Sequence, residues 1–289
     1  MKNNEQVLVS VCILTYNSSK LILETLESVK QQSYNNIELI ICDDGSSDDS
    51  VKICKEWITE NKDCFVRAEV FVNEKNKGIS PTRNFAVKQS QGEWIKFLDS
   101  DDLLTPNAIA SYVNAISEKT HFIIGNYIPF DEKGEKTIEK NQVTLPALML
   151  KKETFEQLGG FDERFLMLED FPFFSKAKKA NYTFDWMDEP VIYYRQHSGS
   201  IQRTPQFHLS HVNYVNQVVV PDYLNEKKYI DYWHDKLWSK KELAKIANQP
   251  IKAFFIYLLM LVFDPKEWYY IVRDKIYRPI VFKWRKMKK

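Results

Sequence analysis

Three carboxylates lie within four residues at Asp99-Ser100-Asp101-Asp102, directly after the apolar segment 94–98 (WIKFL). Neighbouring carboxylates repel one another, so such a cluster is unfavourable unless a cation offsets its charge. Both outer acids of an Asp-X-Asp (DXD) pattern can face a hard divalent cation, which prefers oxygen ligands and shares its other positions with phosphate oxygens. An ion held there stabilises a departing diphosphate as a Lewis acid. The cluster therefore indicates metal-assisted chemistry on a diphosphate.

Two further polar clusters follow apolar segments in the same way. Thr15-Tyr16-Asn17 follows residues 7–14, and Asp43-Asp44-Gly45-Ser46 follows residues 37–42. Each cluster alone is more simply a polar turn or a helix cap. In open α/β sheets, however, ligands bind beyond the carboxyl ends of the strands. Three such clusters at one sheet edge favour a binding site.

A separate pair of acids, Glu169-Asp170, lies between apolar residues in the segment LMLEDFPFF. We expect the pair at the start of a helix. Two interpretations are open from the residues alone. The acids can cap the helix, where its dipole favours negative charge, or one of them can be a general base that takes a proton from an acceptor hydroxyl.

Apolar runs and helical spacings alternate along roughly the first 125 residues, which predicts a parallel sheet with helices on both faces and right-handed crossovers. Strands are expected at 7–14, 37–42, 66–72, 94–98 and 121–125, and helices at 21–29, from 47 to 58, at 81–88 and after 106. The rhythm then changes. We expect a hairpin over 127–143, helices at 153–158 and 170–180, and a strand at 191–194.

The composition excludes several classes of protein. With 289 residues, 44% of them hydrophobic and 14% aromatic, the chain can bury a large core and is not disordered. Its formal net charge of +1 does not point to a polyanion partner such as nucleic acid. The four cysteines form no CxxC pair, which favours free thiols in a reducing compartment. Neither a secretory signal nor an apolar segment of about 18–20 residues, as a membrane span needs, is expected.

Several segments together are similar to a known family: SVCILTYN, ELIICDDGSSDDS, NKGISPTRN, IKFLDSDDLLTP, GGFDERF, LEDFPFF and YYRQHSGS. In this order and spacing they resemble the family-2 inverting glycosyltransferases of the GT-A fold over roughly residues 7–200. The resemblance implies an α/β fold, with a GT-A nucleotide-binding, Rossmann-like sheet and a C-terminal helical extension. We expect a catalytic domain at 1–205 and a helical, basic and aromatic region at 206–289.

The resemblance also implies which residues bind the nucleotide-sugar. Tyr16 would stack on the base, Asp43 would hydrogen-bond the base edge, and Arg83 would reach the base or the diphosphate. Asp99 would meet the ribose or the sugar. The remaining donor-binding candidates belong to the same clusters: Thr15, Asn17, Asp44 and Ser100.

Metal and catalytic roles follow from the same resemblance. Asp101 would bind Mn²⁺ or Mg²⁺, with Asp99 on the same ion and His197 contacting it from the far side. Asp170 would be the catalytic base, supported by Glu169. One base and no enzyme nucleophile then suffice for a single displacement at the anomeric carbon, which inverts its configuration.

The resemblance favours a UDP-sugar donor, because UDP is the commonest carrier in the family. It favours one hexose-type transfer per visit, because the chain has no QxxRW segment. Two other enzyme classes, a dinucleotide oxidoreductase and a sugar-nucleotide pyrophosphorylase, need glycines where this chain has TYNSS. A non-catalytic nucleotide- or glycan-binding module on the same fold is the remaining alternative, and the presence of Asp101 and Asp170 argues against it.

The final segment is basic and aromatic, with nine Lys and Arg against two acids over residues 265–289. Basic helices rich in Trp and Tyr bind membrane interfaces. A helical subdomain packed on the catalytic domain is the alternative. The membrane interpretation predicts a peripheral enzyme at the inner face of the cytoplasmic membrane. It would act on a lipid-linked glycan in lipopolysaccharide (O-antigen) or capsule synthesis, with no nucleic acid partner.

Overall fold

The computed structural model describes residues 7–131, 134–135, 145–165, 167–197, 204–219, 221, 229–253 and 256. The chain divides into two compact units, Met1–Ser200 and Ile201–Lys289. Each unit is considered by itself. The division of roles between residues 1–205 and 206–289 stays a prediction.

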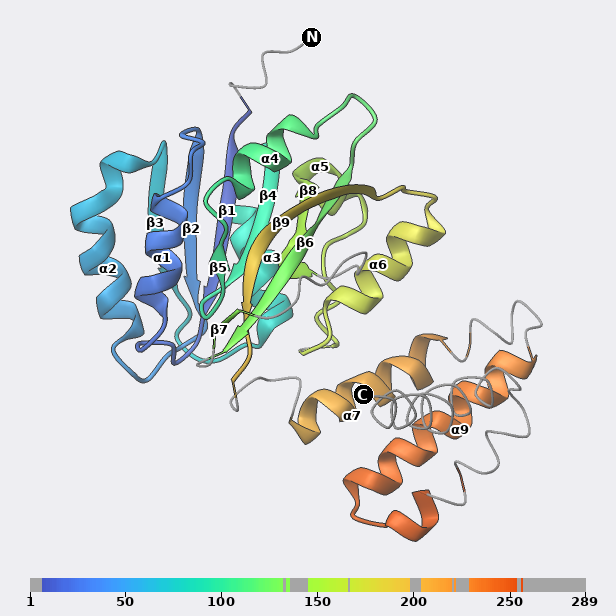
Figure 1. Cartoon of the computed structure of the whole chain (residues 1–289). Helices are drawn as coiled ribbons and strands as arrows, with labels where there is room; N and C mark the ends of the chain where they lie inside the picture. Colours follow the sequence, from blue (N-terminus) through green and yellow to red (C-terminus); the bar gives the residue numbers. More distant parts are fainter. Residues whose placement is uncertain are drawn as a thin grey trace, which may run out of the picture. The chain divides into compact units, whose positions relative to one another are not determined.

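The first unit alternates strands and helices (Figure 1). Its elements are β1 (Val9–Thr15), α1 (Ile22–Lys30), β2 (Ile37–Asp43), α2 (Ser50–Asn61), the 3₁₀ turn η2 (Lys62–Cys64), β3 (Arg67–Val72), α3 (Ile79–Gln89), β4 (Trp94–Asp99), β5 (Leu103–Leu104), α4 (Ala108–Asn114), β6 (Phe122–Asp131), β7 (Gly134–Glu135), the 3₁₀ turn η3 (Leu145–Ala147), β8 (Leu148–Lys151), α5 (Lys152–Gln157), α6 (Asp170–Lys179) and β9 (Asp185–Arg195).

These strands form a nine-stranded sheet in the order β3-β2-β1-β4-β8-β6-β9-β5, with β7 paired to β6. β1 is parallel to both β2 and β4, and β2 is parallel to β3, as the alternation of elements predicts. β8 then enters between β4 and β6 and is antiparallel to both. The sheet is therefore mixed. β8 was missed because four residues before a helix, three of them apolar, are too few to show a periodicity of their own.

The expected hairpin after residue 127 is confirmed where the structure describes it. Phe130 pairs with Glu135 and Asp131 with Gly134, both antiparallel. The rest of the predicted segment 127–143 lies outside the described residues. β9 is longer than expected, because it begins at Asp185 and runs parallel to β6 as far as Arg195.

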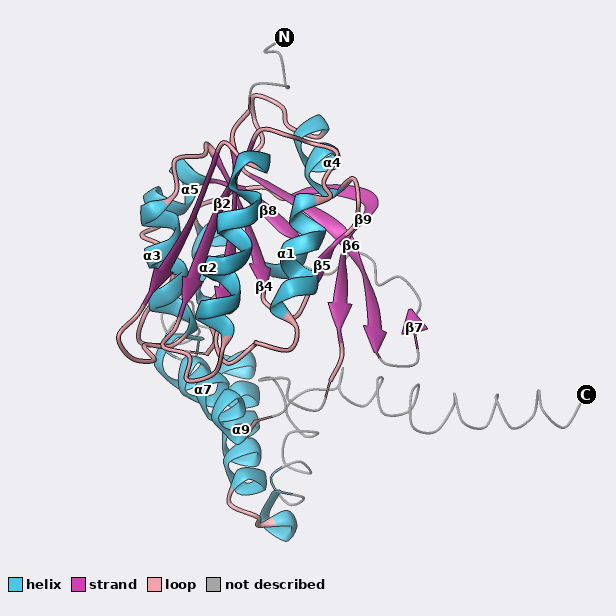
Figure 2. Cartoon of the chain, turned by 90° about the vertical axis from the view of Figure 1, so that its left-hand side faces the viewer, coloured by secondary structure: helices cyan, strands magenta, loops and turns pink. Residues whose placement is uncertain are grey.

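The side chains of the sheet divide between two hydrophobic clusters, one on each face. Val9, Val11 and Ile13 of β1 face the cluster built with α1, α2 and α4. Cys12 and Leu14 face the cluster built with α3, α5 and α6. Alternate residues of a strand point to opposite faces, so a continuous apolar run is what a strand covered on both sides requires. Figure 2 shows α1 and α2 together in front of the sheet.

The second unit is helical where it is described. α7 (Pro205–Tyr214) is capped by Thr204, whose Oγ1 accepts a hydrogen bond from Phe207 N, and it continues into the π-helical turn η5 (Val215–Val219). α9 (Tyr229–Ile246) follows. Within the part of the chain that the structure describes, no helix has both the length and the apolar character needed to cross a membrane. Most of the basic segment 251–289 lies outside that part.

One buried charge lies in the middle of the sheet. Lys96 on β4 is fully buried, and its Nζ donates to Phe97 O at 2.6 Å and to Pro146 O at 2.5 Å. Burial lowers its pKa from 10.5 to about 7, although the charges of Asp99 and Asp102 oppose the shift. The lysine therefore anchors η3 from inside the core, and its ammonium is costly to keep there.

Replacing Lys96 should change how stability depends on pH. The unfolded chain keeps the Lys96 proton up to about pH 10.5, whereas the folded chain releases it near pH 7. Unfolding therefore takes up a proton between these values, and the stability of the parent protein rises with pH there. We expect the difference in free energy of unfolding between the parent and Lys96→Met to shift in favour of the parent by up to about 1.4 kcal/mol per pH unit. Chemical denaturation from pH 6 to 10 measures it, and a constant difference contradicts the assignment.

Candidate active site

The three polar clusters meet at the carboxyl edge of the parallel strands. The β1–β2 register pairs Thr15 with Asp43, and the β1–β4 register pairs Leu14 with Asp99. The loops that follow these strands therefore begin side by side. This is the edge at which open α/β sheets bind their ligands.

The loops after β1 and β2 are joined by polar side chains. Asn17, in a left-handed conformation with φ of 50°, accepts a hydrogen bond from Ser47 N at 2.9 Å. Asp48 accepts from Ser19 N and from Ser50 N, both at 3.0 Å. Burial acts to raise the pKa of Asp48, but the hydrogen bonds from Ser50 and Ser19 outweigh it and lower the pKa to about 2. The loops after β1 and β2 are therefore connected to each other by hydrogen bonds.

Asp43 and Asp44 are both buried, and each uses its carboxylate within the protein. Asp43 Oδ1 accepts from Gly45 N at 3.0 Å and from Ser46 N at 2.8 Å, which closes a tight turn on the end of β2. Gly45 has a φ of +78°, and a Cβ there would lie 2.7 Å from Asn76 N. Only glycine fits this approach of two backbones.

Asp44 organises the segment between β3 and α3. Its Oδ1 accepts from Asn73 Nδ2, Lys77 N and Thr82 Oγ1 at 3.0, 2.8 and 2.9 Å, and its Oδ2 accepts from Gly78 N at 2.9 Å. Four donors therefore converge on one carboxylate. Donor binding by Asp43 and Asp44 stays a prediction, since this structure shows both residues building the loops that frame the site.

Two residues at the end of β1 have groups available for contact with a ligand. Tyr16 is 51% exposed, although it follows a fully buried strand. Thr15 is buried, and within the described part of the chain its Oγ1 has no hydrogen-bond partner. A buried hydroxyl without a partner is unfavourable, so a ligand that reaches this edge gains a hydrogen bond there. Ser18 Oγ and Ser100 Oγ, 2.7 Å apart, connect this loop to the acid cluster.

Burial and mutual repulsion raise the pKa values of two acids that follow β4. Burial and the charge of Asp99 raise the pKa of Asp101, with His197 opposing. Burial and the charges of Asp101 and Asp99 hold the pKa of Asp102 well above its usual range. His197 Nε2 lies 2.8 Å from Asp101 Oδ2. Asp102 Oδ1 accepts from Arg195 N at 2.8 Å, while its Oδ2 has no partner among the described residues.

This donor set fits a divalent cation. Carboxylate oxygens suit Mg²⁺ and Mn²⁺, and a single imidazole nitrogen beside them is a common transition-metal ligand. A cation would offset the charge that raises the pKa values of Asp101 and Asp102. The structure brings two predicted ligands, Asp101 and His197, into contact, while Asp99 turns toward Arg83. Among the described residues, no group of three or more His, Cys, Asp or Glu side chains is arranged to hold a metal ion.

Arg83 joins the acid cluster to the second pair of acids. Its guanidinium is buried, lies over the Phe97 ring, and pairs through Nη2 with Asp99 Oδ1 at 2.5 Å. Through Nη1 it pairs with Glu169. The predicted contact of Arg83 with the base or the diphosphate stays a prediction. What the structure shows is an ion-pair bridge from the end of β4 to the start of α6.

Glu169 and Asp170 lie at a helix start, as expected. α6 begins at Asp170, and Glu169 precedes it without a capping hydrogen bond from its side chain. Asp170 Oδ1 accepts from Phe171 N at 2.8 Å. Glu169 therefore does not cap α6, because Arg83 takes its carboxylate. Asp170 lies in the first turn, where the helix dipole favours the charged form.

Sequence reasoning missed Arg195. Its Nε donates to Asp101 O at 2.7 Å, its Nη2 pairs with Glu24 Oε2 at 2.6 Å, and its guanidinium lies 4.5 Å from the Phe130 ring centroid. It therefore holds the acid cluster against α1 and β6. One signal was available: Arg195 stands two residues before His197 at the end of a strand, and residues spaced by two share a face.

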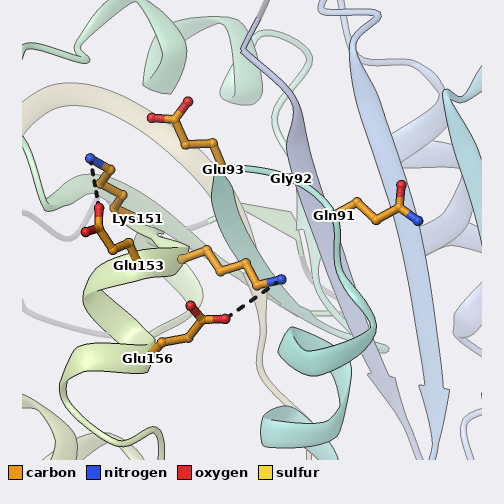
Figure 3. A pocket seen from close by; sticks show the side chains of 7 residues that line it. Gln91, Gly92, Glu93, Lys151, Glu153 and Glu156 are labelled. Carbon is orange, nitrogen blue, oxygen red and sulfur yellow. Dashed lines mark ion pairs between the residues drawn. The ribbon is translucent and has the colours of Figure 1, made fainter.

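A shallow depression of about 520 Å³ lies at the opposite edge of the sheet (Figure 3). It is lined by Gln91, Gly92, Glu93, Lys151, Lys152, Glu153 and Glu156. Two ion pairs lie among these residues, Lys151–Glu153 at 3.4 Å and Lys152–Glu156 at 3.9 Å. None of the predicted site residues borders it, so it is separate from the candidate active site.

Comparison with known proteins bears on the family. The family model described as glycosyl transferase family 2 matches residues 10–176, more than half of the chain. The glycosyltransferase GlyG of Streptococcus pneumoniae serotype 4 is 29% identical over 238 residues, covering 70% of this chain and 75% of that protein. An Escherichia coli protein, UDP-Glc:alpha-D-GlcNAc-diphosphoundecaprenol beta-1,3-glucosyltransferase WfaP, is 40% identical over 121 residues, covering 42% and 46%.

Two solved structures share the fold. TarS 1–349 of S. aureus in complex with UDP-GlcNAc has a TM-score of 0.58 and 19% identity, covering 88% of this chain and 90% of that one. The mannosyltransferase PcManGT of Pyrobaculum calidifontis, in complex with GDP-Man and Mn²⁺, has a TM-score of 0.60 and 14% identity, covering 89% and 76%.

Asp44→Asn tests the loop framework. The amide NH₂ accepts no hydrogen bond, and in either orientation it would face a backbone N–H group, that of Lys77 or that of Gly78. Because hydrogen bonds to a charged group contribute about 1.5–3 kcal/mol each, we expect the variant to lose roughly 3 kcal/mol of unfolding free energy in chemical denaturation. Asp49→Asn is the matched control. Asp49 is exposed and makes no capping bond from its side chain, so we expect a change below about 0.5 kcal/mol. Equal effects of the two changes contradict the role of Asp44.

Proposed function

The chain belongs to glycosyl transferase family 2 and has the GT-A fold, and on this premise we propose that it moves one sugar from a UDP-sugar to a glycan hydroxyl with inversion. One observation carries the proposal. Arg83 links the Asp99–Asp102 cluster, which suits a metal and a diphosphate, to the Glu169-Asp170 pair, which suits proton removal. A donor end and an acceptor end are therefore held in one site.

The donor would lie along the carboxyl edge of the sheet. Exposed Tyr16 supplies a flat aromatic face for a base, and Thr15 Oγ1 supplies a hydrogen bond. We favour UDP as the carrier because TarS has been solved with UDP and with UDP-GlcNAc, and the name of WfaP specifies UDP-Glc. PcManGT carries GDP-Man, so GDP is the alternative carrier.

Asp101 and His197 would hold a Mn²⁺ or Mg²⁺ ion, as PcManGT is solved with Mn²⁺. When bound, such an ion supplies charge neutralisation for the leaving diphosphate. Asp170 would accept the proton of the attacking hydroxyl. Glu169 would support Asp170 by fixing the start of α6 through its ion pair with Arg83. The attack comes from the face opposite the diphosphate and needs no enzyme nucleophile.

The acceptor would be a lipid-linked glycan in surface polysaccharide synthesis. The name of WfaP specifies a diphosphoundecaprenol-linked sugar. The excess of basic residues over 265–289, interleaved with Trp and Tyr, suits an anionic membrane surface. The enzyme would then work as a peripheral protein at the inner face of the cytoplasmic membrane and add one sugar per visit.

Asp170→Asn separates binding from catalysis. The amide keeps the size of the side chain but cannot take a proton, so we expect UDP release from UDP-Glc or UDP-GlcNAc to fall at least 100-fold. UDP with Mn²⁺ should still raise the melting temperature as it does in the parent, because a ligand that binds only the folded state stabilises it, and EDTA should remove the effect.

Asp188→Asn is the control, since Asp188 is exposed and belongs to the early part of β9. It should match the parent in both measurements. Turnover by Asp170→Asn near the parent rate rejects the base assignment. No stabilisation of the parent by any nucleotide favours a different function on this fold.

Membrane binding is tested by vesicle flotation of the full chain. Replacing Lys283, Arg285, Lys286, Lys288 and Lys289 by Gln removes five positive charges, each of which contributes about 1 kcal/mol near an anionic surface. We expect the parent to float with phosphatidylglycerol-rich vesicles and the variant to stay largely at the bottom. Equal flotation of both chains, or flotation of neither, contradicts the proposed role of this segment.

A further inference from the structure

One face of α3 carries three side chains that contact residues 161, 165 and 169, in the segment 161–169 of which residue 166 is not described. Ser80 Oγ donates to Phe165 O at 2.7 Å, Arg83 pairs with Glu169, and Asn84 bonds to Phe161. Positions 80, 83 and 84 lie on one helix face, since residues three and four apart are neighbours there. The segment they hold ends at the Glu169-Asp170 pair.

Asn84 makes the most specific of these contacts. Its Oδ1 accepts from Phe161 N at 2.9 Å, and its Nδ2 donates to Phe161 O at 3.0 Å and to Glu163 Oε1 at 2.9 Å. The carboxamide thus satisfies both backbone groups of one residue, as a neighbouring strand would. Few side chains besides Asn and Gln offer a donor and an acceptor in this arrangement.

The two glycines before Phe161 leave room for the Asn84 side chain. Gly159 and Gly160 both have positive φ, at +76° and +66°. A Cβ on Gly160 would lie 2.9 Å from Asn84 Oδ1, so a larger residue would push the carboxamide away. The Phe161 ring is buried, with its centroid 5.0 Å from that of Phe155 and 5.1 Å from that of Phe173. Phe173 belongs to α6, so the position of Phe161 is passed on to the helix that carries Asp170.

On the donor side, α3 contributes Thr82, and Arg83 contributes to both sides. Thr82 Oγ1 donates to Asp44, and Arg83 pairs with Asp99. Within the described part of the chain, the hydrogen bonds of the Asn84 side chain go only to Phe161 and Glu163. A change at Asn84 therefore acts on one end of the site.

We propose that Asn84 is a positioning residue for the acceptor end of the site, which fixes segment 161–169 and through it the Glu169-Asp170 pair. The role rests on the proposed function, because it needs Asp170 to act on an acceptor hydroxyl. Loss of the clamp lets the base move by a fraction of an ångström, and such displacements lower turnover while donor contacts remain.

The experiment compares Asn84→Ala and Asn84→Asp in the full chain. Asn84→Asp keeps the acceptor for Phe161 N but loses the donor to Phe161 O and to Glu163 Oε1, and its carboxylate repels that of Glu163. We expect kcat for UDP release from UDP-Glc or UDP-GlcNAc, with octyl glycosides as acceptor probes, to fall about 10- to 100-fold in both variants. KM for the donor and the Kd of UDP with Mn²⁺ should stay within about twofold. Hydrogen exchange should accelerate in 159–169.

The matched control is Asn61→Ala, which removes one Asn side chain that donates to Trp57 O at the end of α2. It should leave kcat, KM and exchange in 159–169 unchanged. Unchanged kcat in both Asn84 variants overturns the inference, and so does a parallel loss of UDP affinity or a general rise in exchange. If the parent itself releases no UDP, the proposed function fails instead, and exchange in 159–169 still decides whether Asn84 holds the segment.

Discussion

A buried guanidinium between two carboxylates is the interaction on which the candidate site depends. Arg83 pairs with Asp99 at the end of β4 and with Glu169 at the start of α6. A charge this deep is tolerated only while its partners remain, and removal of one partner of such a pair typically costs about 3–5 kcal/mol. The strand that presents the acid cluster and the helix that presents Asp170 therefore cannot shift independently. The acid cluster at the donor end and the Glu169-Asp170 pair at the acceptor end are therefore linked by one pair of salt bridges.

Around this unit, the loops satisfy their own polar groups before any ligand arrives. Asp43 closes its own turn, Asp44 gathers four donors from the β3–α3 segment, and Asn17 ties the first loop to the second. Such loops are pre-organised, so binding needs little further ordering. Groups without hydrogen-bond partners in the described part of the chain include Thr15 Oγ1 and Asp102 Oδ2, which mark remaining hydrogen-bonding capacity at this edge.

Local signals predicted the elements better than their contacts. Buried strands such as β1 and β2 can be recognised from their mostly apolar sequences, and Asp residues at strand ends indicate the ligand edge. The contacts of Asp44, Arg83 and Arg195 could not be read in this way, because each partner lies far along the chain: Arg195 meets Glu24, 171 residues away. β8 was missed because nothing within its four residues indicates that they pair with β4 and β6. Burial of Lys96 was likewise invisible, since its carbonyl partner at Pro146 is supplied by η3.

The position of β8 has a consequence for synthesis on the ribosome. β1 pairs with one edge of β4 early, but the other edge gains its partner only when β8 has emerged, roughly 50 residues and 3–10 s later at ordinary elongation rates. An apolar strand with an open edge invites pairing with other chains, and an inward-pointing lysine is one of the protections that natural sheets use. The positive charge of Lys96, in the middle of that strand, disfavours pairing of β4 with other chains until Lys96 is itself buried.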